Sequence, residues 1–298
     1  MWTAVDKAWT AGLLDGEGWI GVTRTRCNAR VGRFRYRAGI SVSQTDPLVV
    51  DTFRRLLGGL GHRFVQDRGK PNKLTHGLHV FKKDDVVAVL EAVLPYLVTK
   101  ADQALDVLAF RQLMDDKEIG GPARDLRAAA LFEALRKAKA DIPRGIPRPI
   151  GPPGDRPDAA WLAALVDGEG HIGIERQHHK RYNRTTHILT LTIVNTDEQL
   201  VRRIHAVARH GNINVKAFDS SNRKPIWRWR ASCDNAVKIL ERIGPYLIRK
   251  KPHLAVVRRF DHTIHRGPNR WSPVLESELR IREECYEEFR RLNKPGRT

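Results

Sequence analysis

The sequence predicts an α+β protein made of two similar domains in tandem, each with the element order α-β-β-α-β-β-α. A nine-residue motif occurs twice, at residues 10–18 and 162–170. Three further landmarks recur in the same order, and every pair lies between 150 and 153 residues apart: 42–46 with 193–197, 94–100 with 244–250, and 125–127 with 278–280. Two copies with so long a period indicate a domain duplication, because a solenoid needs shorter and more numerous repeats.

Each motif copy has the pattern of an apolar helix of small residues that ends at an acid between two glycines. The acids are Glu17 and Glu169, and a tryptophan precedes each copy, Trp9 or Trp161. We expect the first helix at residues 6–15, with Asp6 as its N-cap, and the second at 159–166. The repeat thus places two equivalent carboxylates at the ends of two equivalent helices.

The other elements of the first half follow from periodicity and turn signals. Residues 34–42 alternate apolar with basic or polar side chains, which is typical of a strand with one buried face. Asp46 and Pro47 are placed to begin a helix, as N-cap and first helical residue, and the pair Gly58-Gly59 ends it. The expected strands are 19–26, 35–44, 62–67 and 74–81, and the expected helices after the motif are 46–57, 84–94 and 100–114.

The second half has the same order of elements. Its expected strands are 171–176, 186–195, 212–218 and 225–231, and its expected helices are 197–209, 234–243, 251–264 and 274–292. A helix at 123–140 follows the first half, and a Pro/Gly-rich linker at 142–154, whose composition favours a semi-extended tether, comes next. We therefore expect an N-terminal domain at 1–119, a connecting helix and linker at 120–157, and a C-terminal domain at 158–298.

The chain is strongly basic. Its 298 residues carry 53 Lys and Arg against 34 Asp and Glu, a formal net charge of +19, and 37 of the basic residues are Arg. Arg suits bidentate contacts with phosphate and with guanine. The charge therefore favours a nucleic-acid partner over a membrane surface or an acidic protein.

The sequence carries no targeting or disulfide signal. No apolar run approaches the roughly 18 residues of a transmembrane helix, and the motif helix begins too early for a signal peptide to precede it. The three cysteines, Cys27, Cys233 and Cys285, form neither a disulfide framework nor a CxxC pair. These features predict an intracellular protein, in the cytoplasm, the nucleoid or an organelle, with no membrane association.

The paired motifs, the strands between them and the basic charge resemble the LAGLIDADG homing endonucleases of the single-chain, two-motif type, over nearly the whole chain. The resemblance implies a monomer whose two motif helices pack side by side. Each four-stranded antiparallel sheet would curve into a saddle with helices on one face, and its polar face would bind a long, asymmetric DNA duplex in the major groove. The implied activity is that of intron homing: Mg²⁺-dependent hydrolysis of one phosphodiester in each strand, leaving 3'-hydroxyl overhangs.

The resemblance also assigns candidate catalytic residues. Glu17 and Glu169 match the metal-binding acid of each motif. Gln44 matches a residue at the end of the second strand, and a basic residue after the Pro-Tyr-Leu turn carries over to Lys100 and Lys250.

Four positions depart from the family pattern. Asn195 stands where the first half has Gln44, so its side chain reaches less far toward a water molecule. Leu48 and Gln199 stand where homodimeric members often have Arg, and Thr10 replaces the first Leu of the motif. Because the two sets of side chains differ, we expect the two DNA strands to be cut at different rates.

Small residues in both motifs suit a helix pair at the domain interface. Ala11, Gly12, Ala163 and Ala164 lack bulk, and small residues let two helix backbones approach closely. That approach would bring both motif glutamates to one midline, at helix C-termini where the dipole favours a cation. Mg²⁺ takes oxygen ligands and keeps several waters, so one carboxylate from each half together with DNA phosphates suffices. Mn²⁺ or Ca²⁺ can replace it for binding.

Each of the other candidate residues has a structural alternative. The two lysines would stabilise developing negative charge or lower the pKa of the attacking water, or they only anchor phosphates. Gln44 and Asn195 would orient that water, or they only cap strand ends. We expect Asp15 and Asp167 to bond backbone groups near the partner helix rather than to bind metal.

Arginines of the predicted strands and their connections are the candidate DNA-binding residues. They are Arg24, Arg26, Arg30, Arg33, Arg35 and Arg37 in the first half and Arg176, Arg181, Arg184, Arg223, Arg228 and Arg230 in the second. Trp227 and Trp229 alternate with two of them, and we expect them in the core rather than stacked on bases. The histidine pairs at 178–179 and 262/265 lack the Cys or acid that would complete a zinc set.

Two other functions share this surface. An RNA maturase that helps its host intron to fold would have the same basic saddle, and a DNA-binding protein that no longer cuts would normally have lost one motif acid. Because both Glu17 and Glu169 are present, the nuclease is the favoured interpretation. An intein is disfavoured, since the chain has no Cys or Ser splice start and no terminal His-Asn pair.

Overall fold

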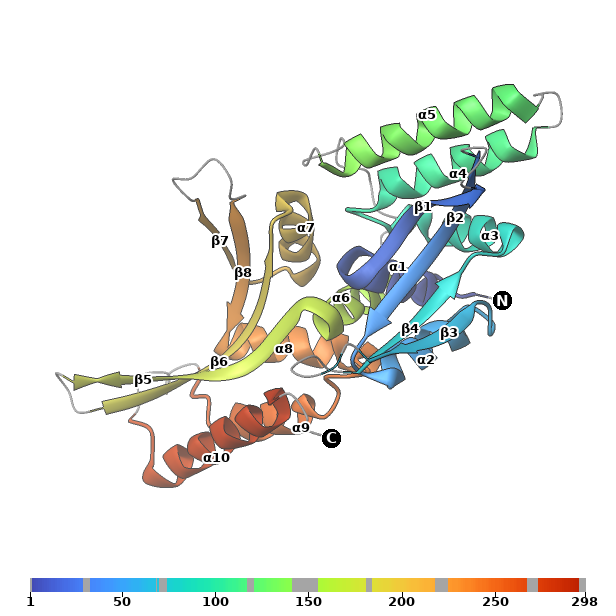
Figure 1. Cartoon of the computed structure of the whole chain (residues 1–298). Coiled ribbons are helices and arrows are strands. Elements are labelled where there is room, and N and C mark those ends of the chain that lie inside the picture. The colour runs from blue at the N-terminus through green and yellow to red at the C-terminus, as the bar shows by residue number, and fades with distance from the viewer. Residues whose placement is uncertain are drawn as a thin grey trace. The chain divides into compact units, whose positions relative to one another are not determined.

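The computed structural model describes residues 2–28, 33–67, 69, 74–116, 121–140, 155–180, 184–217, 225–266 and 273–294. The chain forms two compact units, Met1–Gly168 and Glu169–Thr298, which run from blue to green and from yellow-green to red in Figure 1. The predicted linker at 142–154 lies outside the described residues. The second unit begins at the last residue of the second motif helix, because the rest of that helix belongs to the first unit.

The first unit has the predicted order of elements. They are α1 (Ala4–Glu17), β1 (Gly18–Asn28), β2 (Arg33–Gln44), α2 (Pro47–Leu56), β3 (His62–Gln66), β4 (Thr75–Val80), α3 (Lys83–Val93), the 3₁₀ turn η1 (Leu94–Tyr96), α4 (Ala101–Asp115), α5 (Gly121–Ala140) and α6 (Asp155–Glu169). Its strands form one antiparallel sheet in the order β1-β2-β4-β3.

Helices cover one face of this sheet, and the other face is open. Helices α1 to α4 contact the strands, and five of the strand residues that alternate toward them are at most 1% exposed: Ile20, Ile40, Val42, Leu78 and Val80. Arg35 and Arg37 alternate with these residues and are exposed. The alternation predicted for 34–42 is therefore confirmed from Ala38 onward, whereas Phe34, at the outer end of β2, is 39% exposed.

The second unit repeats the arrangement. Its elements are β5 (Gly170–His179), β6 (Arg184–Asn195), α7 (Glu198–Ala208), β7 (Asn212–Lys216), β8 (Ile226–Ser232), α8 (Cys233–Ile243), the 3₁₀ turn η3 (Gly244–Tyr246), α9 (His253–Asp261) and α10 (Glu276–Asn293). The sheet order is β5-β6-β8-β7, again antiparallel. The predicted α+β class with two duplicated four-stranded sheets is confirmed.

The start of α1 corrects one prediction. Thr3 is the N-cap, and Asp6 stands three residues further on as the acid of a capping box. The Asp6 backbone N–H donates to Thr3 Oγ1 at 3.1 Å, and the Thr3 backbone N–H donates to Asp6 Oδ2 at 3.0 Å. A capping box satisfies two end-of-helix donors at once, which explains why the helix begins earlier than a single Asp cap suggested.

The predicted ends of α2 are confirmed. Asp46 is the N-cap, with its Oδ1 accepting from the Leu48 backbone N–H at 2.9 Å, and Pro47 is the first helical residue. At the other end Gly58 and Gly59 have φ values of 68° and 85°. This left-handed backbone suits glycine and terminates the helix.

Several other boundaries differ by a few residues. Helix α6 extends beyond the predicted 159–166 at both ends, and α9 is shorter than the predicted 251–264 because Pro252 is its N-cap. Strands β1 and β5 run past residues 26 and 176, since each forms a long hairpin with the following strand. Among the described residues no helix is long and apolar enough to cross a bilayer.

Candidate active site and nucleic-acid interface

The two motif helices approach to backbone contact at Gly12. A Cβ atom at this position would lie 2.2 Å from the carbonyl oxygen of Trp161 on α6. Ala11, Ala163 and Ala164 are fully buried. Any side chain at Gly12 would therefore have to push α1 and α6 apart.

The carboxylate of Asp15 joins α1, α6 and the turn that follows η1. Its Oδ1 accepts hydrogen bonds from the backbone N–H groups of Thr99 (3.0 Å) and Lys100 (3.2 Å) and from Thr99 Oγ1 (3.1 Å). Its Oδ2 accepts from the Val98 N–H (2.9 Å) and from the Trp161 indole Nε1–H (3.2 Å). Burial raises the pKa of Asp15, although the Lys100 ammonium and these hydrogen bonds oppose the rise. Both oxygens are thus occupied within the protein.

Lys100 is held against the end of α1. Its Nζ donates to the carbonyl oxygen of Asp15 at 3.0 Å and to that of Leu14. These carbonyls lie at the negative end of the helix dipole, where an ammonium is stabilised. The Asp15 carboxylate fixes the backbone of Lys100 and the helix end fixes its side chain, so the ammonium has a defined position beside the last turn of α1.

Glu17 is the final residue of α1 and is half-buried. Its side chain lies beside Gly168, where an added Cβ would come within 2.9 Å of Glu17 Cγ and 3.4 Å of Glu17 Oε1. Gly168 immediately precedes Glu169, the matching acid of the second motif, which is exposed. A hard divalent cation takes carboxylate oxygens of this kind as ligands.

The two strand-end amides have different surroundings. Gln44 ends β2, is 6% exposed and is paired in register with His76 of β4. Asn195 ends β6, and its Oδ1 accepts from the backbone N–H of Asp197 at 2.9 Å. That bond is the local turn typical of Asn, and it favours the capping interpretation for Asn195.

In the second unit, Lys250 lies among histidines. It is 6% exposed, and its charge acts on His171 and His253. Burial is the main cause that lowers the pKa of both imidazoles, and Lys250 adds to it. His253 Nε2 lies 3.1 Å from Asn293 Oδ1, and the Asn293 amide donates to the carbonyl oxygen of Ile172 at 2.8 Å. This chain of contacts connects α9, α10 and β5.

Arg24 lies on the covered side of the first sheet, in alternation with Ile20 and Val22. Its Nη1 donates to Glu133 of α5 at 3.0 Å, and its guanidinium stacks 4.8 Å from the Phe34 ring centroid and 4.9 Å from that of Phe132. Arg26 has the same alternation and is exposed near the hairpin tip. Arg24 is therefore unfavourably placed for base contact, unlike Arg35 and Arg37 on the open face.

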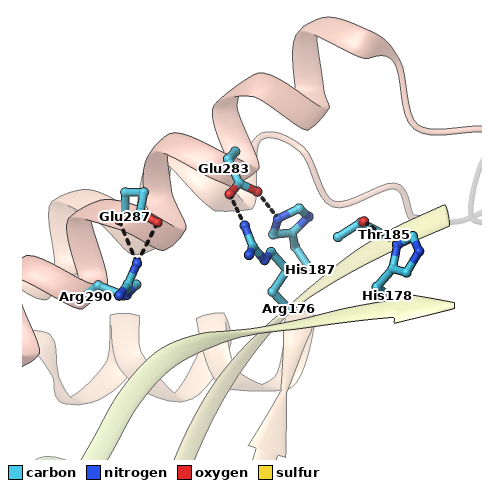
Figure 2. A network of polar contacts seen from close by, with 7 residues as sticks. All are labelled: Arg176, His178, Thr185, His187, Glu283, Glu287 and Arg290. Atoms are coloured by element: carbon cyan, nitrogen blue, oxygen red, sulfur yellow. Dashed lines mark hydrogen bonds and ion pairs between the residues drawn. The ribbon is translucent and has the colours of Figure 1, made fainter. Parts of the chain in front are cut away.

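Arg176 occupies the matching place in the second unit (Figure 2). It forms an ion pair with Glu283 of α10, and the other oxygen of Glu283 lies 2.7 Å from His187 Nε2. The Arg176 guanidinium also stacks 5.0 Å from the Tyr286 ring centroid. The arginine thus clamps α10 to the β5-β6 hairpin.

Arg228 and Arg230 lie on the open face of the second sheet. Arg228 is exposed, and Arg230 donates to Glu175 of β5 at 2.9 Å. Trp229 is fully buried and donates from Nε1 to the His210 carbonyl at 3.0 Å, so its predicted core position is confirmed. Trp227 is half-buried, with the Arg202 guanidinium 5.7 Å from its ring centroid.

The other arginine candidates are not placed in full. Arg30, Arg181 and Arg223 lie outside the described residues, and for Arg33 and Arg184 only the strand backbone is described. Three histidines of these pairs contact protein side chains: residues 178 and 179 contact threonines of β6, and His265 contacts Glu278 at 2.8 Å. No group of three His, Cys, Asp or Glu side chains suited to a metal occurs within the described ranges.

Three rings on the open face of the first sheet were not predicted from the sequence. Phe64 of β3 stacks on His79 of β4 with ring centroids 4.1 Å apart, and Phe81 lies 5.2 Å beyond His79. The guanidinium of Arg37 lies 4.4 Å from the Phe81 centroid. The signal that could have indicated them is the pair of strand glycines, Gly39 and Gly77, because glycine inside a strand often marks a close approach.

Comparison with known proteins gives the same architecture. No protein-family profile matches the chain, and no curated protein sequence does. Among solved structures it is similar to the LAGLIDADG homing endonuclease I-SmaMI bound to cleaved DNA, with 18% identity, a TM-score of 0.68 and coverage of 96% of this chain and 95% of that one. The chain has the LAGLIDADG homing endonuclease fold.

Two further structures of this fold align over as much of the chain. I-LtrWI bound to target DNA has 15% identity and a TM-score of 0.68, covering 96% of this chain and 98% of that one. I-GzeII in complex with its DNA target has 13% identity and a TM-score of 0.66, covering 98% of both chains. The LAGLIDADG fold therefore extends across both units of this chain.

Proposed function

We propose that the chain is a monomeric, site-specific endonuclease that cuts duplex DNA with the help of a divalent metal. The observation that carries the proposal is the pair of motif helices in backbone contact at Gly12, with a carboxylate retained at the end of each. The structural similarity to I-SmaMI, I-LtrWI and I-GzeII, each of which has been determined with DNA, supports the choice of substrate. The net charge of +19 favours the same partner.

Glu17 and Glu169 would hold the metal, for which we propose Mg²⁺, with Mn²⁺ or Ca²⁺ able to replace it for binding. A structure of I-SmaMI with an uncleaved DNA target was obtained in the presence of calcium ions. When bound, such an ion supplies charge neutralisation at the phosphate and lowers the pKa of a coordinated water. Carboxylate oxygens fit this ion because it prefers hard oxygen ligands in octahedral geometry.

The surrounding side chains would orient and stabilise the reacting groups. Lys100, fixed at the end of α1, would hold positive charge near the scissile phosphate, and Lys250 would do so in the second half. Gln44 would hold the attacking water by a hydrogen bond. Because Asn195 Oδ1 already accepts from the Asp197 N–H, the second half would orient water less well. The two DNA strands would then be cut at unequal rates.

The open faces of the two sheets would bind the duplex along its major groove. Arg35 and Arg37 are the placed candidates in the first unit, and Arg228 and Arg230 are those in the second. We propose a long, asymmetric target and products with 3'-hydroxyl overhangs, as expected for intron homing. Affinity should fall steeply as salt rises, because each neutralised phosphate releases a counterion.

The test is cleavage of a randomised or genomic duplex pool with Mg²⁺, followed by sequencing of the new ends. The Glu17→Gln/Glu169→Gln double variant is the inactive comparison, and Glu91→Gln, a change at an exposed helix glutamate, is the matched control. Discrete cuts at one non-palindromic site, made by the unaltered protein and by Glu91→Gln but not by the double variant, would support the proposal. Absence of cutting together with binding to structured RNA by both proteins would favour an RNA maturase instead.

A further inference from the structure

The open face of the first sheet carries a compact stack that the catalytic site does not use. Its layers are Arg37 from β2, Phe81 after β4, His79 from β4 and Phe64 from β3, in that order; we call the three rings the aromatic strip. The guanidinium lies 4.4 Å from the Phe81 centroid, and successive ring centroids are 5.2 Å and 4.1 Å apart. The Phe64 and His79 rings are stacked with an interplanar angle of 11°, whereas His79 and Phe81 are tilted by 34°.

Two strand glycines hold the outer rings close to the sheet. A Cβ at Gly39 would lie 2.3 Å from Phe81 Cδ1, and a Cβ at Gly77 would lie 2.1 Å from Phe64 Cζ. The rings thus rest where any other residue would place a side chain. Such a stack loses little conformational freedom on binding a partner, which is the condition for a preorganised contact.

The strip makes its closest contact face to face within itself, because Phe64 and His79 stack at 4.1 Å with an interplanar angle of 11°. Stacking on an unpaired base requires a free aromatic face, and this shared face is covered. Burial, together with the charges of His62 and Arg37, lowers the pKa of His79, which favours the neutral imidazole. The result is an uncharged, apolar ridge of half-buried rings, flanked by the exposed cations Arg35 and Arg37.

The second unit has no such ridge at the matching sheet positions. His79 pairs in register with Ser41, and the equivalent pair in the second sheet is Arg230 with Thr192. By the same register, Phe64 opposite Gly77 corresponds to Asn214 opposite Arg228. The two open faces therefore differ in chemistry where their backbones match.

We propose that the aromatic strip is a base-reading element that selects thymine, by apolar contact of its rings with thymine C5-methyl groups, next to a guanine contacted by Arg37. This inference rests on the proposed binding of duplex DNA in the major groove. Apolar side chains recognise the thymine methyl there, and Arg recognises the O6 and N7 atoms of guanine. The first half of the target would therefore be recognised in part through apolar contacts, which the Arg228/Arg230 face of the second unit does not offer to the other half.

The experiment uses the duplex target recovered by the cleavage selection, with each thymine of the first half-site replaced in turn by deoxyuracil. This change removes one methyl group and nothing else. We expect binding of the unaltered protein, measured with Ca²⁺, to weaken about fourfold at two or three neighbouring thymines, the value of one buried methyl. In Phe64→Ala and Phe81→Ala the deoxyuracil penalty should disappear at the thymine nearest the altered ring.

Gly77→Ala provides an independent variant, because its Cβ displaces the Phe64 ring without changing Phe64. It should lose the same methyl dependence as Phe64→Ala, and Phe64→Leu covers the case in which the alanine variant fails to fold. Asn214→Ala, at the equivalent position of β7, is the matched control and should keep every penalty of the first half-site.

Equal deoxyuracil penalties in all variants would overturn the inference while leaving the proposed nuclease intact. The inference would also be overturned if the ring variants lost binding to single-stranded nucleic acid while their duplex methyl dependence stayed unchanged. That result would make the strip a stacking platform. Failure of the unaltered protein to select any duplex would overturn the proposed function and this inference with it.

Discussion

Truncation of Asp15 should destabilise the first unit more than any change of similar size on the surface of α1. The carboxylate is 4% exposed and accepts from three backbone N–H groups, one hydroxyl and one indole. In Asp15→Ala all of these donors lose their acceptor. Trp161 is 2% exposed, so its indole N–H cannot find water, whereas the half-buried turn 98–100 can be rehydrated in part.

The expected loss of unfolding free energy follows from this difference between the buried indole and the half-buried turn. One buried donor left without an acceptor costs about 1–3 kcal/mol, and Lys100 loses the negative charge of Asp15 as well. Removing one partner of a buried charged network typically costs about 3–5 kcal/mol. We therefore expect a loss of about 3–5 kcal/mol for Asp15→Ala, and a smaller loss for Asp15→Asn, which keeps one acceptor oxygen.

The assay is urea unfolding combined with residue-resolved amide hydrogen exchange. The amides of Val98, Thr99 and Lys100 should exchange faster in Asp15→Ala, because their acceptor is gone. Asp6→Ala, on the exposed first turn of the same helix, should cost about 1 kcal/mol and leave these amides unchanged. A loss below about 1 kcal/mol for Asp15→Ala, with the three amides still protected, would refute the reasoning.

Three further outcomes follow from the structure. Gly12→Ala should destabilise by about 1–3 kcal/mol and lower cleavage activity, because its Cβ would collide with α6 backbone; an unchanged thermal midpoint would contradict the close approach. Burial depresses the pKa of His253 in the folded state, so its contribution to stability is present above about pH 6.5 and is lost as the pH falls through the folded-state pKa. His253→Gln should therefore flatten this pH dependence of the unfolding free energy, measured by urea unfolding at pH 7.5 and 5.5. An identical slope in the variant would count against it. Arg35→Ala should weaken duplex binding and reduce the salt slope by about one, whereas Arg24→Ala should change the salt slope little and loosen α5; equal salt effects would show that the covered-face arginine also reaches DNA.

Much of the fold could be predicted because its signals are local. The alternation of residues 38–42, the Asp46-Pro47 start of α2 and the Gly58-Gly59 stop each depend on neighbours a few positions away. The duplication is likewise a property of the linear sequence. Helix ends were less well predicted, as at Thr3 and Pro252, because several residues can cap a helix and only the backbone geometry selects one.

The role of each arginine was only partly accessible. Arg24 alternates with Ile20 and Val22, so the side of the sheet on which it lies was present in the sequence. Its partner Glu133, however, is 109 positions away on α5. A sequence pattern gives the face of a strand, but it does not say which helix covers the far end of that face.

The sequence by itself determined the duplicated α+β architecture, the two motif helices, the retained glutamates and the basic charge, since all of these are written in short-range pattern and composition. Only the tertiary structure decided what Asp15 binds and where the aromatic strip lies. The partners of Asp15 are between 83 and 146 positions away, and the strip exists because the strand order β1-β2-β4-β3 places His79 between Phe64 and the strand of Arg37. Contacts of this kind depend on strand order and helix packing, which are set by burial of the whole core and not by any local segment.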